Sequence, residues 1–292
     1  MAKSERLRLS LRINRAIWNR LPVGLRNTPA GRWYGTMLHA KVRQGADRRQ
    51  YFGTSFLRNR AQLEQIRRLA VTRPEGASFD LAVLGCSIGA EVYSVLWTIR
   101  KARPDLKVKT MALDISPEVL AVAERAVYSS EASALVGWSI FDRLSEAERE
   151  QIFDWDGNEG TVKPWIRAGV RFQLGNAADP EIVRTLGPQD MVLASNFLCH
   201  MAPMAAQSCL RNIARLVKPG GHLLVVGVDL DVREKLAREL AWQPVPELIR
   251  EIHEGDPDVR RDWPCEWWGL EPLDDRRRDW RLRYGAIFTL VG

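Results

Sequence analysis

The chain has 292 residues, of which 46% are hydrophobic and 27% are charged, as is typical of a folded globular protein. Its longest apolar runs, such as residues 222–228, are far shorter than the roughly 20 residues that cross a bilayer. No apolar stretch follows the first positive charges, so the pattern of a secretory leader is missing. We therefore expect a cytoplasmic protein without a membrane span.

The net charge of +7 is concentrated near the N-terminus, where residues 1–70 hold 16 Lys and Arg but only 3 Asp and Glu. Such asymmetry predicts either a basic face for an acidic partner or a solvated helical surface. The partner could be a protein, a nucleic acid or an anionic lipid. No RNA-binding signature or zinc-finger pattern accompanies the charge, which argues against nucleic acid.

The four cysteines are scattered along the chain without a CxxC pair: Cys86, Cys199, Cys209 and Cys265. This spacing predicts neither a disulfide framework nor a zinc site. We interpret each cysteine as a small core residue and expect no bound metal.

Residues 1–72 are predicted to form a basic helical N-terminal region. Residues 4–20 repeat apolar side chains at near-helical spacing among arginines, which indicates an amphipathic helix packed on the body of the protein. Residues 21–31 break this periodicity with Pro and Gly and are expected to be a connector. A second helix is expected near 55–72.

From residue 79 onward, apolar strand patterns alternate with helix patterns. We expect strands at 79–86, 107–116, 168–177, 189–199, 222–230 and 281–292, and helices at 89–102, 117–129 and 202–221. Ser116 is a predicted N-cap, and Ser145 with Glu148 forms a predicted capping box. Strands joined through helices imply an α/β fold, with a doubly wound, mostly parallel sheet in a domain spanning 73–292.

The stretch 241–280 contains five tryptophans. Aromatic residues at this density either fill the core at one end of the sheet or line a pocket. The sequence leaves both interpretations open.

Ligands of parallel sheets bind beyond the carboxyl ends of the strands, where the strand order reverses. Gly85 ends the first strand and Gly89 opens the next helix, so the backbone can turn tightly and approach a ligand. The segment lacks the GxGxxG pattern, which favours a nucleoside smaller than a dinucleotide. Asp114 follows the second strand and can accept hydrogen bonds from ribose hydroxyls, and Asn176 could read an adenine edge. Together these positions predict a bound adenosyl group.

Six segments, in order and over roughly residues 50–230, resemble the CheR-type chemoreceptor glutamate methyltransferases, which use S-adenosylmethionine (SAM). "GCSIGAEVYS" is similar to their "CSTGEEPYS", "TSFLRN" to "TxFFR", and "ALDIS" to "ATDID". "VRFQLGNAAD", "SNFLCHM" and "LVKPGGHLLVVG" are similar to three further family segments. The resemblance implies the class I, Rossmann-like fold of SAM-dependent methyltransferases.

The resemblance also implies a SAM site made of Thr54, Arg58, Gly85, Cys86, Ser87, Gly89, Glu91, Asp114, Ile115, Asn176, Ala177, Ser195 and Asn196. In this set Thr54 and Arg58 would approach the methionine portion, and Glu91 would pair with its ammonium group. Asp114 would hold the ribose, and Asn176 and Ala177 would hold the adenine. Ser195 and Asn196, in the fourth expected strand at 189–199, would lie near the sulfonium.

The chain also departs from the family pattern. Ser195 replaces an arginine and His200 replaces a tyrosine. Residues 154–169 look too few for the three strands of the β-subdomain with which family members grip receptor tails, so we expect most of it to be missing. Arg58 is expected to orient a carboxylate acceptor, whereas His200 would act as the base for a hydroxyl or amine acceptor. The alternative for His200 is a histidine at the edge of the site that hydrogen-bonds to the backbone.

These observations predict a SAM-dependent methyltransferase that acts on an oxygen of a small molecule, peptide or protein other than a chemoreceptor. Two alternatives stay open. One is a chemotaxis-type protein glutamate methyltransferase. The other is a SAM-binding module without catalysis, whose basic N-terminal region docks on an acidic protein partner.

Overall fold

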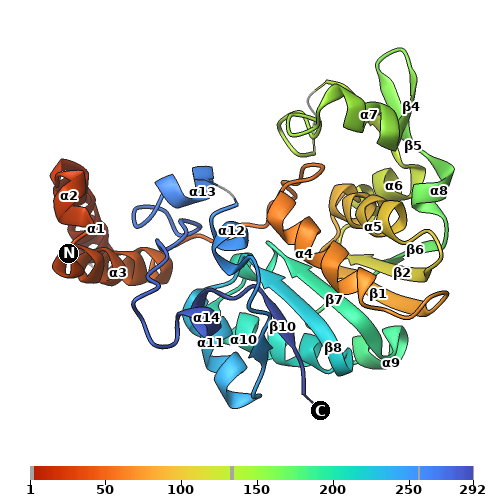
Figure 1. Ribbon diagram of the computed structural model, residues 1–292. Helices are drawn as coiled ribbons and strands as arrows, with labels where there is room; N and C mark the ends of the chain where they lie inside the picture. The colour runs from red at the N-terminus through yellow and green to blue at the C-terminus, as the bar shows by residue number, and fades with distance from the viewer. Residues whose placement is uncertain (1–2, 132–134, 256, 292) are drawn as a thin grey trace. The chain divides into compact units, whose positions relative to one another are not determined.

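The computed structural model describes residues 3–131, 135–255 and 257–291 (Figure 1). The chain divides into two compact units, which we call the helical unit (1–49 with 256–274) and the sheet unit (50–255 with 275–292). Among the described residues, no helix is both long enough and apolar enough to cross a membrane.

The helical unit contains α1 (Lys3–Arg20), α2 (Val23–Arg26), α3 (Pro29–Gln44) and α13 (Pro257–Arg261). The expected helix at 4–20 is thus confirmed as α1. The core of the unit is built by Trp18, Leu38, Val42 and Trp263, with the rings of Trp18 and Trp263 edge-to-face at 5.3 Å. A tryptophan from the C-terminal half of the chain therefore completes the core of the N-terminal helices.

The expectation of a plain connector at 21–31 is only partly right, because α3 begins inside it. Thr28 caps α3 by accepting a hydrogen bond from the backbone N–H of Gly31 at 3.1 Å, and Pro29 is the first helical residue. A proline at this position sacrifices no helical hydrogen bond. Pro and Gly here mark the start of a helix.

The sheet unit is built on a seven-stranded sheet of order β6-β2-β1-β7-β8-β10-β9 (Figure 1). The strands are β1 (Ser78–Leu84), β2 (Lys107–Asp114), β6 (Val170–Leu174), β7 (Gln189–Ser195), β8 (Val217–Val226), β9 (Gln243–Pro244) and β10 (Ile287–Thr289). The five neighbouring strands β6, β2, β1, β7 and β8 pair in parallel, and β10 is antiparallel to both β8 and β9. The predicted doubly wound, mostly parallel sheet is confirmed, and its strand order reverses between β1 and β7.

Both faces of the sheet are buried. Along β1, Leu81 and Val83 join one hydrophobic cluster while Ala82 and Leu84 join the other, because successive side chains of a strand point to opposite faces. The helices of the unit are α4 (Arg60–Val71), α5 (Ala90–Ala102), α6 (Pro117–Arg125), α7 (Glu146–Ile152), α8 (Pro164–Arg167), α9 (Ile182–Leu186), η1 (Leu198–His200), α10 (Pro203–Ala214), α11 (Leu230–Glu239), α12 (Ile249–His253) and α14 (Trp280–Tyr284). Residues of α4 and α5 belong to the first cluster, and residues of α10 and α11 to the second.

The division expected at residue 72 differs from that of the compact units. α4 packs against the same hydrophobic cluster as α5 and so lies in the sheet unit. Residues 256–274 lie in the helical unit, because Trp263 packs with its core. Of the five tryptophans in 241–280, Trp242 is also buried and packs on Phe288 in the sheet unit, with ring centroids 5.5 Å apart.

A small three-stranded sheet forms in this part of the chain, where the sequence indicates too few residues for three strands. Residues 154–169 supply only two antiparallel strands, β4 (Phe153–Asp156) and β5 (Glu159–Val162), as their length suggested. The third strand, β3 (Val127–Ser129), comes directly after α6 and pairs with β5, giving a small sheet of order β3-β5-β4. Phe153 anchors it by packing on Phe56, with ring centroids 4.9 Å apart.

Candidate functional site

The predicted site residues follow four neighbouring strands of the large sheet. Asn176, Asp114, Gly85 and Ser195 lie at or just beyond the ends of β6, β2, β1 and β7, in that spatial order. Because these strands are parallel, their carboxyl ends share one edge of the sheet. The structure thus brings these four positions together at the point where the strand order reverses.

The turn between β1 and α5 has a backbone that favours glycine. Gly85 has φ +66°, and a Cβ atom there would lie 2.7 Å from the ring of Phe197. Gly89 has φ +87° and caps α5, and Ser87 between them also has a positive φ of 50°. Side chains of Phe197 and Tyr93 pack where the Cβ atoms of Gly85 and Gly89 would stand, so the packing of this turn favours glycine at both positions.

Asp114 holds this turn in place. Its Oδ2 accepts a hydrogen bond from the Ser87 backbone N–H at 2.8 Å, and its Oδ1 accepts one from the Ser116 backbone N–H at 3.1 Å. The Cys86 backbone N–H donates to the carbonyl of Leu113 at 3.0 Å. The end of β2 thus fixes the loop that follows β1, with the Asp114 side chain buried between them.

Glu91 lies in the first turn of α5, where the helix dipole favours a negative charge. Burial raises the pKa of Glu91, while the nearby Ser195, Arg58 and Gln62 oppose that rise. Gln62, a buried residue of α4, donates from Nε2 to Glu91 Oε1 at 3.2 Å. The site therefore holds an acid whose ionisation the surroundings support only in part.

The hydroxyl of Ser195 at the end of β7 is also buried. It lies close to Glu91 but outside hydrogen-bond geometry, and its Oγ has no hydrogen-bond partner among the described residues. Since a buried hydroxyl without a partner is costly, this atom is a natural contact for a ligand.

The segment with Thr54 and Arg58 runs along the start of α4. Trp138 Nε1 donates to the Thr54 carbonyl at 3.2 Å, and the Leu57 backbone N–H donates to Ser94 Oγ at 3.0 Å. Thr54 is buried, and Arg58 lies near enough to Glu91 for its charge to lower the pKa of that acid. The structure therefore places the charge of Arg58 near Glu91.

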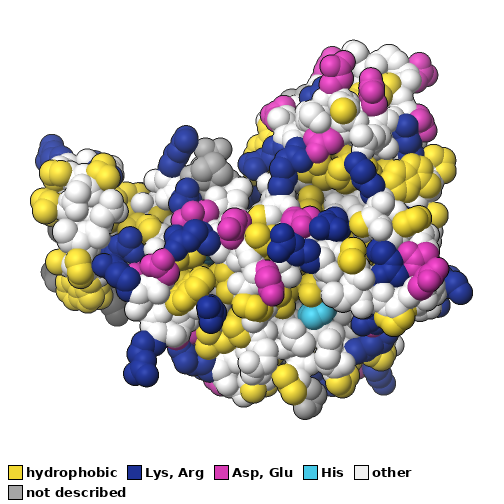
Figure 2. Space-filling model, in the orientation of Figure 1, with side chains coloured by type: hydrophobic (Ala, Val, Ile, Leu, Met, Phe, Trp, Pro, Cys, Tyr) yellow, Lys and Arg dark blue, Asp and Glu magenta, His cyan; other side chains and the backbone are white. Residues whose placement is uncertain are grey.

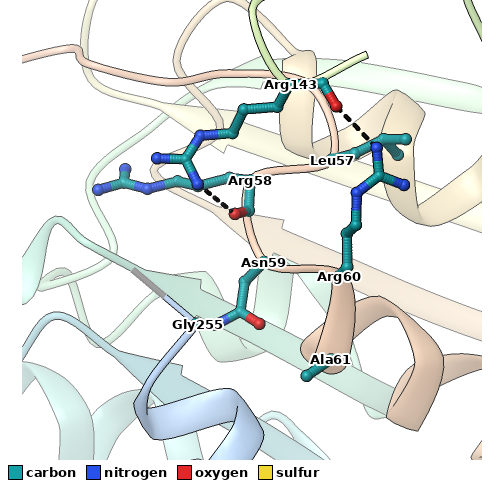
Figure 3. A pocket seen from close by; sticks show the side chains of 7 residues that line it. All are labelled: Leu57, Arg58, Asn59, Arg60, Ala61, Arg143 and Gly255. Carbon is teal, nitrogen blue, oxygen red and sulfur yellow. Dashed lines mark hydrogen bonds between the residues drawn. The ribbon is translucent and has the colours of Figure 1, made fainter. Parts of the chain in front are cut away.

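A pocket of about 380 Å³ opens beside this segment, lined by Leu57, Arg58, Asn59, Arg60, Ala61, Arg143 and Gly255 (Figure 3). Lys and Arg side chains also gather on the surface near α4 and α7 (Figure 2). Sequence reasoning missed Arg60 and Arg143. Arg60 stands two residues after Arg58, which is a usable signal, but Arg143 comes from a loop that no motif marks.

The remaining predicted residues lie along the same edge. Ile115, after Asp114, is 52% exposed, and the exposed Asn176 accepts a hydrogen bond at Oδ1 from the Ala178 backbone N–H at 2.9 Å. Ala177 is buried. Asn196 has φ +58° and its N–H donates to Val226, while His200 ends the short helix η1.

Residues 53–239 match the family model described as CheR methyltransferase, SAM binding domain. Chemotaxis protein methyltransferase 1 of Vibrio cholerae is 30% identical over 146 residues, which are 48% of this chain and 50% of that protein. The chemotaxis protein methyltransferase of Listeria monocytogenes is 23% identical over 179 residues, 60% of this chain and 64% of that protein. An uncharacterised 104.1 kDa protein of Rhodobacter capsulatus is 26% identical over 181 residues, 58% of this chain and 18% of that protein.

The chain thus spans at most about two thirds of the length of these relatives, and half of the Vibrio protein. Among solved structures, magnesium protoporphyrin IX methyltransferase of Synechocystis with bound SAM is similar at a TM-score of 0.36 and 16% identity. That similarity covers 64% of this chain and 70% of the other.

Proposed function

This chain belongs to the CheR methyltransferase family, and from that premise we propose that it transfers a methyl group from SAM to a carboxylate oxygen of an acceptor. Its sheet is the class I, Rossmann-like fold of SAM-dependent methyltransferases. SAM is the cofactor of the matched domain, and its sulfonium supplies an activated methyl group that a nucleophile takes by in-line displacement.

The residues at the carboxyl edge fit this cofactor. The Gly85–Gly89 turn follows β1 at the edge where the adenosyl group would lie, and Ser195 Oγ is a buried hydroxyl without a hydrogen-bond partner among the described residues. Each Asp114 oxygen uses one lone pair on a backbone N–H and keeps another for a ribose hydroxyl. The Oδ1 of Asn176 accepts a hydrogen bond from the Ala178 backbone N–H, and its Nδ2 would donate to an adenine ring nitrogen.

Glu91 is the observation that carries the proposal. It is a half-buried acid, and burial raises its pKa despite the nearby Ser195 and Arg58. The amino group of the methionine portion would supply the missing positive charge through a charge-assisted hydrogen bond. Ile115, exposed beside Asp114, would then cover the adenine.

Arg58 favours a carboxylate as the acceptor. Its guanidinium lies near Glu91, at the methionine end of the proposed cofactor position, and can hold an anion by paired hydrogen bonds. A carboxylate oxygen attacks without losing a proton, so no base is needed. The new C–O bond forms as the C–S bond breaks, and the electron pair of that bond stays on sulfur.

A chemotaxis-type glutamate methyltransferase is the second candidate. The small sheet of β3, β4 and β5 supports it, because the resemblance implies a three-stranded subdomain with which family members grip receptor tails. We include in the same proposal that the basic N-terminal region docks on an acidic protein partner. The proposal includes a cytoplasmic location, since the cytoplasm is where cells make SAM.

Labelled methyl transfer tests the proposal. The full chain is incubated with SAM carrying a tritiated methyl group and with an extract of its own cells, separated into protein and small-molecule fractions. A methyl ester releases volatile methanol in mild base, so we expect base-labile label that disappears in Arg58→Gln. Base-stable label would indicate a hydroxyl or amine acceptor. SAM binding without any label would indicate the non-catalytic module.

A further inference from the structure

We propose that the outer face of the N-terminal helices docks on the surface of an anionic lipid bilayer. The outer face is the side of α1 and α3 that lies opposite residues 257–274 of the helical unit, which we call the return segment. The inference goes beyond the proposed function, because it concerns where the protein is held and involves no step of methyl transfer.

The first part of the outer face is an apolar strip on α1. Leu9, Ile13 and Ile17 recur every four residues and are 50%, 52% and 48% exposed. Ile13 and Ile17 each stand two positions from Arg15, which is about 200° around an α-helix. Arg15 pairs with Glu266 of the return segment at 3.8 Å. The strip on α1 therefore points away from the return segment.

The second part of the outer face is an apolar strip on α3. Trp33 and Met37 are 66% and 45% exposed. Each stands two positions from Gly35, so both lie on the opposite side of the helix from that glycine. Gly35 faces the return segment, because a Cβ atom on it would lie 2.2 Å from the ring of Trp263. The strip on α3 therefore also points away from the return segment.

α1 and α3 lie next to each other, so the two strips belong to one surface. Tyr34 Oη donates to Asn14 Oδ1 at 2.8 Å, and the rings of Tyr34 and Trp18 are 6.2 Å apart. Both hydrophobic and basic side chains are exposed on these helices (Figure 2). The outer face thus combines five large apolar side chains that the described parts of the chain leave half exposed or more.

The outer face is also basic. Residues 6–46 contain nine Lys and Arg and no Asp or Glu. Arg20 follows Ile17 by three residues and Lys41 follows Met37 by four, so both cations lie on the outer face. Both are exposed, and neither forms an ion pair among the described residues. Their charges are therefore available to an anionic partner.

An anionic bilayer matches both properties of the outer face. Aliphatic and tryptophan side chains partition into the boundary between headgroups and acyl chains, while Lys and Arg are attracted to anionic headgroups. The second candidate function gives this region an acidic protein as its partner. Such a partner would neutralise the cations, but charge alone gives the five apolar side chains nothing to pack against. The apolar strips therefore favour the lipid surface.

Sedimentation with lipid vesicles tests the inference on the full chain. One set of vesicles is phosphatidylcholine alone, and the other contains about one third phosphatidylserine. We expect binding to the anionic vesicles to be about tenfold stronger, because each cation near a charged surface contributes roughly a fivefold gain. Added salt should weaken that binding, since it screens the charges. Equal binding to both sets, or no binding to either, overturns the inference.

A double variant, Ile13→Gln with Ile17→Gln, tests the apolar strip. It should bind the anionic vesicles about tenfold more weakly, because an amide does not partition into the acyl boundary. Val71→Gln is the matched control, since Val71 is 46% exposed at the end of α4 in the sheet unit, and it should bind as the wild type does. Unchanged binding by the double variant would show that charge alone holds the protein and would overturn the inference.

A second double variant, Arg20→Gln with Lys41→Gln, tests the cations. It should also weaken binding to the anionic vesicles about tenfold. The matched control is Lys107→Gln with Lys109→Gln, which removes two exposed cations of β2 and should change nothing. Equal losses in the two double variants would show that net charge matters and the outer face does not, which contradicts the inference.

A poly-glutamate peptide separates the lipid surface from an acidic protein. If the full chain binds this peptide but no anionic vesicle, the acidic protein partner is supported and the inference is wrong. Methyl transfer is measured in none of these experiments. Their outcome is therefore independent of the labelled-methyl test of the proposed function.

Discussion

The carboxylate of Asp114 accepts a hydrogen bond from the backbone N–H of Ser87 at 2.8 Å, so the acid that ends β2 fixes the turn that ends β1. The acid that the proposal assigns to the ribose is therefore also part of the scaffold. Its two roles are separable, because alanine removes both and asparagine keeps the shape of the side chain.

Asp114→Ala leaves the backbone N–H groups of Ser87 and Ser116 without their acceptor. Unsatisfied buried donors cost roughly 1–3 kcal/mol, so we expect a loss of that size in the free energy of unfolding, measured in denaturant. Asp114→Asn should lose less stability and still bind SAM poorly, because its amide no longer offers two acceptor oxygens. An Asp114→Ala protein as stable as the wild type would contradict the scaffold role.

Glu91→Gln should raise stability. Burial raises the pKa of Glu91, so its ionised form weakens the fold at neutral pH, and the penalty disappears as pH falls through that raised pKa. A glutamine keeps an oxygen for the Gln62 donor and carries no charge. Thermal unfolding at pH 7 should show a gain of about 1 kcal/mol, which shrinks in acid. A loss of stability at pH 7 would contradict this account of the site.

Gly85→Ala tests the close approach of Phe197 to the turn. The new Cβ would lie 2.7 Å from the Phe197 ring, in addition to the cost of φ +66°. Gly76→Ala is the matched control, since Gly76 has φ +64° and no atom within 4 Å of its Cβ position. Measured by denaturant unfolding, the loss in free energy of unfolding should be about 1 kcal/mol for the control and about 1–3 kcal/mol larger for Gly85→Ala. Equal losses would mean that the turn is not constrained by Phe197.

Glu148→Gln should make the free energy of unfolding depend less on pH in the acid range. Hydrogen bonds from Arg60 lower the pKa of Glu148 from 4.5 to about 2. The stabilisation is therefore complete above pH 4.5 and is lost as pH falls toward about 2. The difference in unfolding free energy between the wild type and Glu148→Gln should shrink over this range. A difference that is constant with pH would show that the ion pair contributes nothing to stability.

His200→Gln distinguishes the two kinds of acceptor oxygen. A carboxylate needs no base, so the pH dependence of kcat/KM should be unchanged in the variant. If a limb of the wild-type profile vanishes in His200→Gln, the histidine acts as a base and the acceptor is a hydroxyl. The measurement uses labelled methyl transfer from pH 5 to 9.

The large sheet could be predicted because each of its main strands is a short apolar run bounded by turn residues. β8 begins five residues before the strand that the sequence predicts at 222–230, because "KPGG" reads as a helix stop. Val217 pairs with Gln189 of β7, and after an irregularity His222–Val226 pair with Met191–Ser195. β3 was missed because a three-residue strand has no period of its own. It exists only through its pairing with β5, whose paired residues lie 30 to 34 positions further along the chain.

The residues of the site likewise fall into those that local sequence patterns predict and those that only the fold brings together. Gly85 and Asp114 could be placed from local patterns because each stands at the end of one strand, and Glu91 because it stands in the first turn of the helix that follows β1. Gln62 and Arg143 act through contacts between distant segments, with Glu91 and Arg58 respectively. The packing of Trp263 on Trp18 is likewise invisible to local periodicity.

Titration of SAM into the full chain tests the central claim most directly. The account predicts a dissociation constant in the micromolar range, roughly −8 kcal/mol, for the wild type. Removing the charge of Glu91 should cost about 1.5–3 kcal/mol, a 10- to 100-fold weakening in Glu91→Gln. No binding by the wild type, or equal affinity in the two proteins, would contradict the claim that Glu91 holds the cofactor.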